Sequence, residues 1–457
     1  MTKKTRFILF SFLVILFLLI APTIIFYSQG YRFNFDEKKI VRTGGVYLKV
    51  QPRGAQIYID GKLVKKTDFL FGQALIDNLL PNKHKIEVKK SGYFPWMKNL
   101  AVQEQWVTET KNIFLVLQNP KFNILNNEVK DFFFSPDLKK ILLKKESKKG
   151  WSLNLLNLEK NTEAVLLNEK EAGENLEFYT IQWSDDSKKI LLNLTNEEYV
   201  IFDADEEKLT SLDFLGRINQ VFFDPKNSQK IFFVQDIAKK NNLFSTNYLK
   251  RETLRPILKD FVTYQVANNN FFWLEKSGIF YISNSAGEKI DTLNLDPIHI
   301  KPESQYQLIV ISPGKIFLKE GNILYYLNQD KKILEKISEG IKETKTSPDF
   351  KKMAYFTDYE IWIIFLEKIT SQPQKEKGEK LFLTRFSEKI GDVFWWTSHY
   401  LVFNVGNSIN IIEIDERDNI NMYTLAEFPT PKIFWNKDNK ILYILSNGNL
   451  YFSQKLY

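Results

Sequence analysis

An internal repeat constrains the fold of this chain more than any other feature. An apolar run, a polar turn and a second apolar run recur eight times, clearly so in FFFSPDLKKILL (132–143), IQWSDDSKKILL (181–192) and KTSPDFKKMAYF (345–356). The first turn residues lie about 43 residues apart on average and are Ser135, Ser184, Asp224, Asn268, Ser312, Ser347, Thr397 and Asn436. This period is typical of the four-stranded blades of a β-propeller. The sequence therefore predicts a propeller over 121–457 with about eight blades, or seven if one weak repeat is a false count.

Packing between blades accounts for the aromatic residues of the repeats. A blade has two apolar faces that only its neighbours can cover, so aromatic side chains collect at the blade interfaces. Trp395 and Trp396 would point to opposite faces of one strand, which favours core packing over a sugar-stacking platform. The short run Phe122–Leu125 precedes the first repeat, and the chain ends one strand short of a full last blade. We expect this run to pair with the last blade and close the ring.

The N-terminal region predicts a membrane anchor. Residues 7–27 carry no charge and follow Lys3, Lys4 and Arg6. As a helix they would span roughly 31 Å, which matches the hydrocarbon core of a bilayer. The alternative is a cleaved signal peptide, whose apolar region is usually about 7–15 residues and ends in a small-x-small site. The leading positive cluster favours a cytoplasmic tail at 1–6 and an extracytoplasmic C-terminal region.

A polar stalk at 28–44, with a possible hairpin that includes Asp36 and Glu37, precedes a small antiparallel β domain at 45–118. Val46–Val50 alternates apolar and polar residues, as expected for a strand with one buried face. The sequence Asp60-Gly61 then predicts a two-residue hairpin turn, because glycine tolerates the positive φ that this turn needs.

The motifs of this domain resemble the PEGA domain family. Pro52-Arg53-Gly54-Ala55 stands at the position of the family's Pro-Glu-Gly-Ala tetrapeptide, and Ile57–Lys62, His84-Lys85-Ile86 and Lys90–Tyr93 follow. The chain departs from the family at Arg53, Asp68 and Asn82. The resemblance implies an extracytoplasmic, non-enzymatic surface module. The residues that we assign to its structural turn motif are Pro52, Gly54, Ala55, Asp60, Gly61, Gly92 and Tyr93.

The repeats in turn resemble the WD40-like propeller repeats of the TolB type. The S-P-D-G turn of that family appears as Ser135-Pro136-Asp137 and Ser347-Pro348-Asp349, in both cases without the glycine. This resemblance implies a fold rather than a function, because the propeller architecture hosts binding proteins and enzymes alike.

The sequence contains little that points to catalysis, and it predicts no catalytic residue, cofactor or metal site. There is no cysteine, and the three histidines, His84, His299 and His399, lie in different segments without metal-ligand spacing. The acidic run Asp203–Glu207 lacks the glycine and the distal glutamate of an EF-hand and is interpreted as a solvated loop. The polar segment Thr370–Lys380 predicts a mobile blade loop.

These observations favour a non-catalytic binding or scaffolding protein of the bacterial cell envelope. It would be anchored in the lipid bilayer through 7–27, with its C-terminal domains outside the cytoplasm, and would bind envelope polysaccharide or envelope protein. Nucleic acid is excluded as a partner, because the net charge of +8 is spread along the chain without a basic stripe. The alternatives are a propeller-type glycan hydrolase or lyase and an envelope assembly factor.

Overall fold

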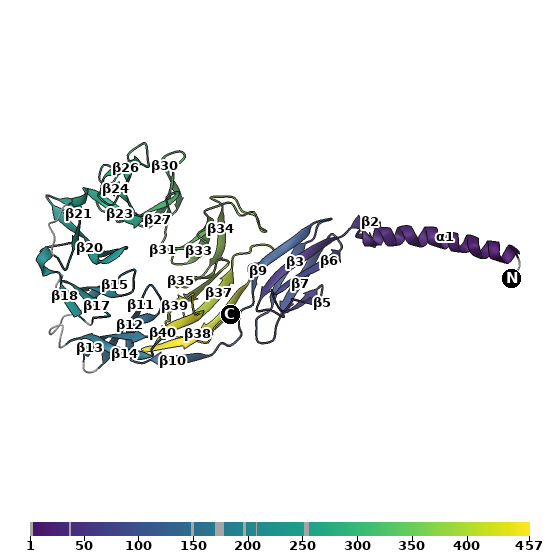
Figure 1. Ribbon diagram of the computed structural model, residues 1–457, viewed down its shortest axis with the longest axis horizontal. Coiled ribbons are helices and arrows are strands. Elements are labelled where there is room, and N and C mark those ends of the chain that lie inside the picture. The colour runs from purple at the N-terminus through teal and green to yellow at the C-terminus, as the bar shows by residue number, and fades with distance from the viewer. Residues whose placement is uncertain are drawn as a thin grey trace.

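The computed structural model describes residues 3–35, 38–147, 150–169, 178–194, 198–206, 208–250 and 256–457. These residues form one α-helix, a hairpin, a small β module and a ring of four-stranded sheets, in that order along the chain, with a short 3-10 helix η1 (Asp213–Leu215) within the ring (Figure 1). The predicted fold class, an all-β protein with an N-terminal apolar helix, is confirmed.

Helix α1 (Lys3–Ser28) continues through Pro22, and none of its residues is buried. Its length and composition are compatible with a single-pass membrane anchor or a signal sequence. Two residues later the chain forms the antiparallel pair β1 (Tyr31–Asn34) and β2 (Lys39–Arg42), which we call the juxtamembrane hairpin. The possible hairpin of the predicted stalk is therefore present, although Asp36 and Glu37 lie outside the described residues.

The next seven strands form two sheets around one core, and we call them the N-terminal module. The three-stranded sheet has the order β6-β3-β9, with β9 parallel to β3, and the four-stranded sheet has the order β5-β4-β7-β8. The strands are β3 (Gly44–Gln51), β4 (Gln56–Ile59), β5 (Lys62–Lys66), β6 (Gln73–Leu79), β7 (Lys83–Lys89), β8 (Trp96–Ala101) and β9 (Val107–Phe114). Buried side chains of both sheets, such as Leu48, Ile57 and Ile86, form a single apolar cluster between them.

Eight four-stranded sheets follow as propeller blades in the described part of 122–453. Blades 1 to 3 are β11 (Val129–Phe134), β12 (Lys140–Ser147), β13 (Gly150–Asn157), β14 (Thr162–Asn168); β15 (Phe178–Trp183), β16 (Lys189–Leu194), β17 (Tyr199–Asp203), β18 (Lys208–Ser211); and β19 (Gln220–Asp224), β20 (Asn227–Ile237), β21 (Lys240–Asn247), β22 (Pro256–Lys259). Blades 4 to 6 are β23 (Phe261–Ala267), β24 (Asn270–Glu275), β25 (Phe280–Ser283), β26 (Lys289–Thr292); β27 (Tyr306–Ser312), β28 (Lys315–Glu320), β29 (Ile323–Asn328), β30 (Ile333–Ser338); and β31 (Glu343–Thr346), β32 (Lys352–Phe356), β33 (Glu360–Phe365), β34 (Lys380–Arg385). Blade 7 is β35 (Ile390–Thr397), β36 (Tyr400–Val405), β37 (Ser408–Glu413), β38 (Met422–Glu427), and blade 8 is β39 (Lys432–Asn436), β40 (Ile441–Ser446), β41 (Asn449–Ser453) with β10 (Phe122–Asn126).

The ring closes as the sequence predicts. Strand β10, from before the first repeat, pairs with β41 at the end of the chain, with Phe122 opposite Ser453 (Figure 1). Each of the eight blade interfaces holds its own cluster of buried apolar side chains. Trp395 belongs to the cluster between blades 6 and 7, whereas Trp396 belongs to the cluster between blades 7 and 8. Their predicted placement on opposite faces is confirmed.

The S-P-D-type turns have one shared geometry. In the turn at 347–352, the Ser347 hydroxyl donates to Asp349 Oδ1 (2.6 Å) and accepts from the Lys352 amide (3.0 Å). The turns that begin at Ser135 and Ser184 repeat both bonds. The fourth turn residue, where the related repeats have glycine, has a positive φ in all three: Leu138, Ser187 and Phe350. The chain thus places ordinary side chains in a left-handed backbone conformation.

Candidate functional site

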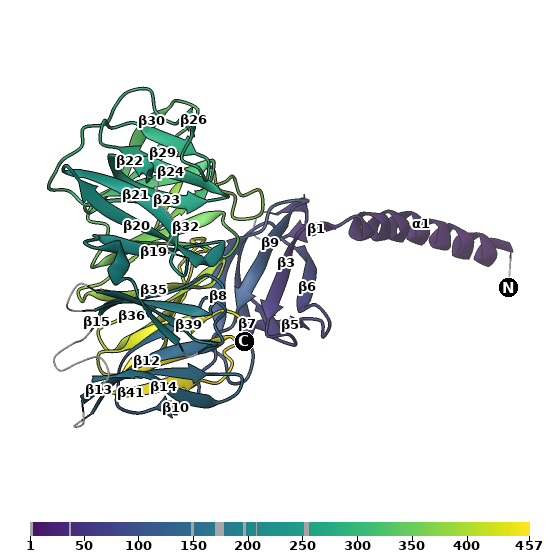
Figure 2. The ribbon, with the colours of Figure 1, turned by 60° about the vertical axis from the view of Figure 1, so that its left-hand side comes forward.

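The N-terminal module packs against blade 7, next to blades 6 and 8 (Figure 2). The Phe114 ring, at the end of β9, contacts the rings of Trp396, Tyr400 and Tyr457 at centroid distances of 6.0, 5.7 and 5.5 Å. Phe94 stacks on Tyr423 at 5.3 Å. The module and the propeller therefore share an aromatic contact.

A fully buried ion pair lies at this contact. Lys98 of β8 has no exposed side-chain surface, and its Nζ lies 2.7 Å from Glu413 Oε1 at the end of β37. The same ammonium donates to the carbonyl oxygens of Asp415 (2.8 Å), Arg417 (3.0 Å) and Asn419. Burial raises the pKa of Glu413, and the charge of Lys98 opposes this shift. The pair thus joins two segments more than 300 residues apart.

Two polar side chains add a second set of contacts between the module and the propeller. Arg417 forms a bidentate pair with Asp415 (Nη2–Oδ2 2.6 Å, Nε–Oδ1 3.0 Å) and also donates to the Glu109 carbonyl oxygen (2.9 Å). Gln372 accepts a hydrogen bond from the Glu109 amide (3.0 Å) and donates to the Val107 carbonyl oxygen (3.1 Å). The segment predicted to be a mobile loop, Thr370–Lys380, therefore contacts the edge of β9.

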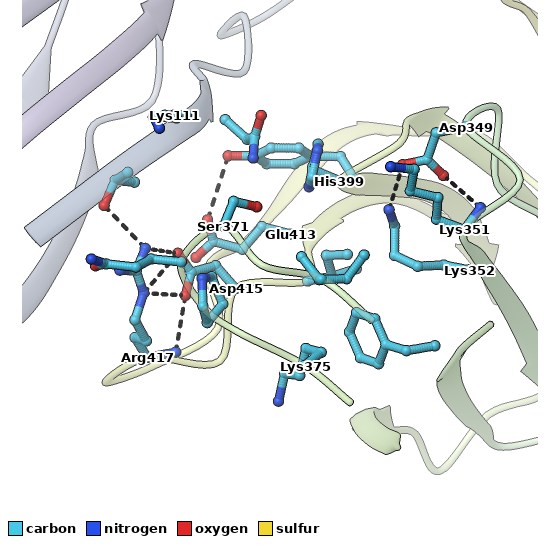
Figure 3. A pocket seen from close by; sticks show the side chains of 18 of the residues that line it. Lys111, Asp349, Lys351, Lys352, Ser371, Lys375, His399, Glu413, Asp415 and Arg417 are labelled. Atoms are coloured by element: carbon cyan, nitrogen blue, oxygen red, sulfur yellow. Dashed lines mark hydrogen bonds and ion pairs between the residues drawn. The ribbon is translucent and has the colours of Figure 1, made fainter. Parts of the chain in front are cut away.

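A cavity of about 360 Å³ lies between the module, blade 6 and blade 7, and we call it the junction cavity. Apolar walls come from Trp96, Ile113, Phe365, Tyr400 and Ile414. Hydroxyl and amide groups come from Thr110, Asn112, Thr370, Ser371 and Gln372. The charged lining residues are Lys111, Asp349, Lys351, Lys352, Lys368, Lys375, Glu413, Asp415 and Arg417, with His399 among them (Figure 3).

Cations exceed carboxylates in this lining, by six side chains to three. Lys352 is buried with its Nζ 2.6 Å from Asp349 Oδ2, and burial lowers the pKa of its ammonium. Burial, and next the charge of Lys352, lower the pKa of His399 to about 4, so this imidazole is neutral at pH 7. At the rim, Lys351 forms no ion pair with the described residues. Carboxylates just outside the lining pair with three of its cations: Glu109 with Lys111, Glu376 with Lys368, and Glu379 and Glu416 with Lys375. The positive excess therefore holds for the lining side chains alone, and most of these cations are already compensated.

All three lining carboxylates already have a cationic partner. Asp349 pairs with Lys352, Glu413 with Lys98, and Asp415 with Arg417. The described residues contain no group of three or more His, Cys, Asp or Glu side chains suited to hold a metal ion. Among the described residues, no carboxylate of the lining is therefore without a cationic partner.

The turn residues singled out in the sequence lie in the module, and none of them lines the junction cavity. Gly54, Asp60, Gly61 and Gly92 have positive φ. Ala55 is buried, donates its amide to the Thr67 hydroxyl (3.0 Å) and accepts from the Thr67 amide (2.9 Å). Pro52 follows a cis peptide, and Tyr93 packs on the module core. The Asp60 carboxylate accepts from His84 Nδ1 (2.7 Å) and from the Lys85 amide (2.9 Å). The assignment of these residues to the structural turn motif of a PEGA-like module stays a prediction.

One other sequence interpretation, that of a solvated loop, concerns the acidic run Asp203–Glu207. Asp203 pairs with Lys189 and accepts from the amides of Asp205 (3.0 Å) and Glu206 (3.1 Å), so its carboxylate organises the turn. Glu207 lies outside the described residues. Asp186 likewise organises its own turn by accepting from Ser184 (2.6 Å) and from Ser228 of the next blade (2.6 Å).

Neither protein-family models nor curated protein sequences match this chain. Among solved structures, the C-terminal WD40 domain of Sif2 aligns with a TM-score of 0.48 and 11% identity, covering 73% of this chain and 98% of that one. The Dos1 propeller (TM-score 0.46, 10% identity, 74% and 94%) and an oligogalacturonate lyase from Vibrio parahaemolyticus (0.42, 11%, 74% and 94%) are further matches. Since similarity at this level is remote, the propeller assignment rests on the strand pairing and blade clusters of this chain.

Proposed function

We propose that this protein is a membrane-tethered, extracytoplasmic binding protein of the bacterial cell envelope, and that the junction cavity binds an acidic glycan. The observation that carries the proposal is the excess of cations around a concave site with apolar walls. A volume of about 360 Å³ falls within the ~300–1,000 Å³ of small-molecule sites, whereas a protein partner would need a contact of ~800 Å² on each side. The hydroxyl and amide groups of the lining suit the hydroxyls of a sugar.

The anchor and the module support the extracytoplasmic part of the proposal. Helix α1 is unburied and carries cations in its first turn, at Lys3, Lys4 and Arg6, ahead of a long apolar stretch. We further propose that the module is a PEGA-like domain, since Gly54, Gly61 and Gly92 occupy left-handed turn positions that favour glycine. Within this arrangement the cavity lies where the module meets the propeller, so ligand binding depends on both parts.

Calorimetry on the full chain in nanodiscs would test the proposal, with a hexuronic acid oligosaccharide against a neutral hexose oligosaccharide of equal length. We expect the acidic sugar to bind, with an affinity that falls as salt is raised, because screening weakens the attraction. The double variant Lys351→Gln and Lys368→Gln should weaken binding at least tenfold, about 1.4 kcal/mol. The matched control is Lys160→Gln with Lys226→Gln, which removes two exposed lysines from blades 1 and 3.

Equal affinity for both sugars, or an equal loss of affinity for the acidic sugar in both double variants, would contradict a specific acidic-glycan site. Cleavage of the acidic sugar during the titration would favour the alternative of a propeller-type hydrolase or lyase. In that case the carboxylates to substitute first are Asp349 and Asp415, which line the cavity.

A further inference from the structure

The juxtamembrane hairpin has one buried and one exposed face. Asn34 and Val41 point inward and are 7% and 3% exposed. Phe33, Phe35 and Ile40 point outward and are 49%, 82% and 68% exposed. Phe33 lies opposite Ile40 in the strand register, and the rings of Phe33 and Phe35 are in contact at 5.1 Å. The hairpin therefore presents a continuous apolar surface to its surroundings.

This apolar face continues the surface of helix α1. The helix ends at Ser28, and the ring of Tyr31 contacts the ring of Phe26 at 5.4 Å. Because side chains alternate along a strand, Tyr31, Phe33 and Phe35 share one side of β1. The side that faces the apolar helix is thus also the side that exposes the two phenylalanines.

The hairpin is fixed to both of its neighbours. Arg32 donates to the Tyr27 carbonyl oxygen (2.6 Å) at the helix end and to Asn78 Oδ1 (2.8 Å) in β6 of the module. Arg42 donates to Gln105 Oε1 (2.7 Å), and the Thr43 hydroxyl donates to the Gly30 carbonyl oxygen (2.9 Å). The segment predicted to be a stalk is therefore a bonded connection between the helix and the module.

We propose that the outward face of this hairpin, formed by Phe33, Phe35 and Ile40, inserts into the head-group region of the bilayer where helix α1 leaves it. Aromatic side chains next to a spanning helix favour that region. Residues 31–42 carry four cations, Arg32, Lys38, Lys39 and Arg42, against two carboxylates, which suits anionic lipid head groups. The inference rests on the proposed anchoring and extends it: the hairpin holds the module and the propeller in a fixed orientation on the membrane.

Quenching of a site-specific fluorophore by lipid-borne quenchers tests this proposal. The full chain is reconstituted into vesicles of mixed neutral and anionic phospholipid. The chain has no cysteine, so one introduced cysteine gives a single site for an environment-sensitive fluorophore. The sites are Phe35→Cys in the hairpin, Leu16→Cys within the helix and Phe69→Cys as the matched control. Phe69 is 84% exposed, like Phe35, but lies at the far end of β6, where Gln73 pairs with Lys49. That end is roughly 17 Å from the hairpin end, where Leu79 pairs with Gly44.

We expect quenching by lipid-borne quenchers at residues 16 and 35, at least threefold above that at residue 69. If residue 16 is quenched and residue 35 is not, the anchor stands and the hairpin proposal is wrong. Equal quenching at 35 and 69 would also overturn it, since any exposed aromatic would then adsorb. If the fluorophore at residue 16 is not quenched by lipid, the proposed anchoring is wrong, and the hairpin proposal is wrong with it.

A double substitution in the labelled protein tests whether the fluorophore itself causes the quenching. In the protein labelled at residue 35, Phe33→Ser with Ile40→Ser should lower lipid quenching at least threefold. The control pair Leu70→Ser with Phe71→Ser removes two other exposed apolar side chains and should leave it unchanged. Unchanged quenching in the first pair would overturn the proposal.

Discussion

Replacing Lys98 by methionine should loosen the contact between the module and the propeller more than any other single change at the junction. At 2.7 Å and an effective dielectric constant of about 20, the attraction between Lys98 and Glu413 is about 6 kcal/mol. Desolvation of the two ions offsets most of this, so the net contribution of the intact pair is small. Removal of one partner is different, because the other charge then stays buried and uncompensated.

We expect Lys98→Met to cost about 3–5 kcal/mol in the free energy of unfolding at pH 8. Glu413 keeps hydrogen bonds from Trp96 (2.9 Å) and the Asn421 amide (3.0 Å), but it loses its only buried cation among the described residues. Glu413→Gln should cost less, about 1–3 kcal/mol, because the carbonyl oxygens of Asp415 and Arg417 still accept from the Lys98 ammonium.

The pH dependence provides the sharper test. With Lys98 gone, the hydrogen bonds from Trp96 and Asn421 still oppose the effect of burial on Glu413 but the cation no longer does, so its folded-state pKa is held further above the ordinary 4.5. A raised carboxyl pKa means that the folded protein binds more protons than the unfolded chain, so stability falls as pH rises above 4.5. The cost of Lys98→Met should therefore be smallest below pH 4.5 and grow towards pH 8.

Urea denaturation of the full chain in detergent micelles, followed by tryptophan fluorescence, measures these costs. Trp96, which donates to Glu413 at the junction, is one of the nine tryptophans that contribute to this signal. Lys130→Met, which breaks an exposed pair with Glu146, is the matched control, and it should change stability by less than about 1 kcal/mol. A cost for Lys98→Met that is below about 1 kcal/mol, or equal at pH 4 and pH 8, would refute the reasoning.

Three further changes probe the turns and the cavity. Phe350→Gly should stabilise the protein by about 0.5–1 kcal/mol in thermal or urea unfolding, because the left-handed backbone costs an ordinary residue ~1–2 kcal/mol. The control Phe350→Ala keeps that cost and should not stabilise the protein. Ser347→Ala should destabilise the protein by about 1–3 kcal/mol, because it leaves the buried Lys352 amide without its acceptor. The control, Ser211→Ala at an exposed serine, should have little effect. His399 should titrate near pH 4 when followed by NMR, with its resonance assigned through the His399→Asn variant. Because its pKa is lowered in the folded state, its contribution to stability is fully present above pH 6.5 and is lost as pH falls towards 4. A titration midpoint near 6.5 would contradict the burial of this imidazole.

The fold was largely predictable because its information is local and repeated. Each blade carries its own strand–turn–strand pattern, and the two-residue period of a strand assigns Trp395 and Trp396 to different interfaces. The apolar run Phe122–Leu125 lies before the first repeat, and the last repeat lacks one strand. Together these two features predict the β10–β41 pair. These inferences need only the order of residues along one segment.

The junction was not predictable in the same way, because its partners are far apart in the sequence and no pattern links them. Periodicity indicates that a face is buried but not what covers it. One local signal was present: in β8, Trp96, Lys98 and Leu100 alternate with exposed residues, so a lysine occupies a buried position. A cation there requires a buried acceptor from another element, and that acceptor is Glu413.

The same logic connects the hairpin, the module and the cavity. Arg32 bonds the helix end to the module, and Lys98 bonds the module to blade 7. The Lys98 contact ties two segments through a buried charge that is costly to leave unpaired. The hydrogen bonds of Arg32 are solvent-exposed and add a weaker restraint between the helix and the module. If the helix spans a bilayer, the height and tilt of the junction cavity above the membrane are then set by the fold. Under the proposed function, this geometry would suit a ligand held in the envelope at a defined distance from the membrane rather than one that diffuses freely.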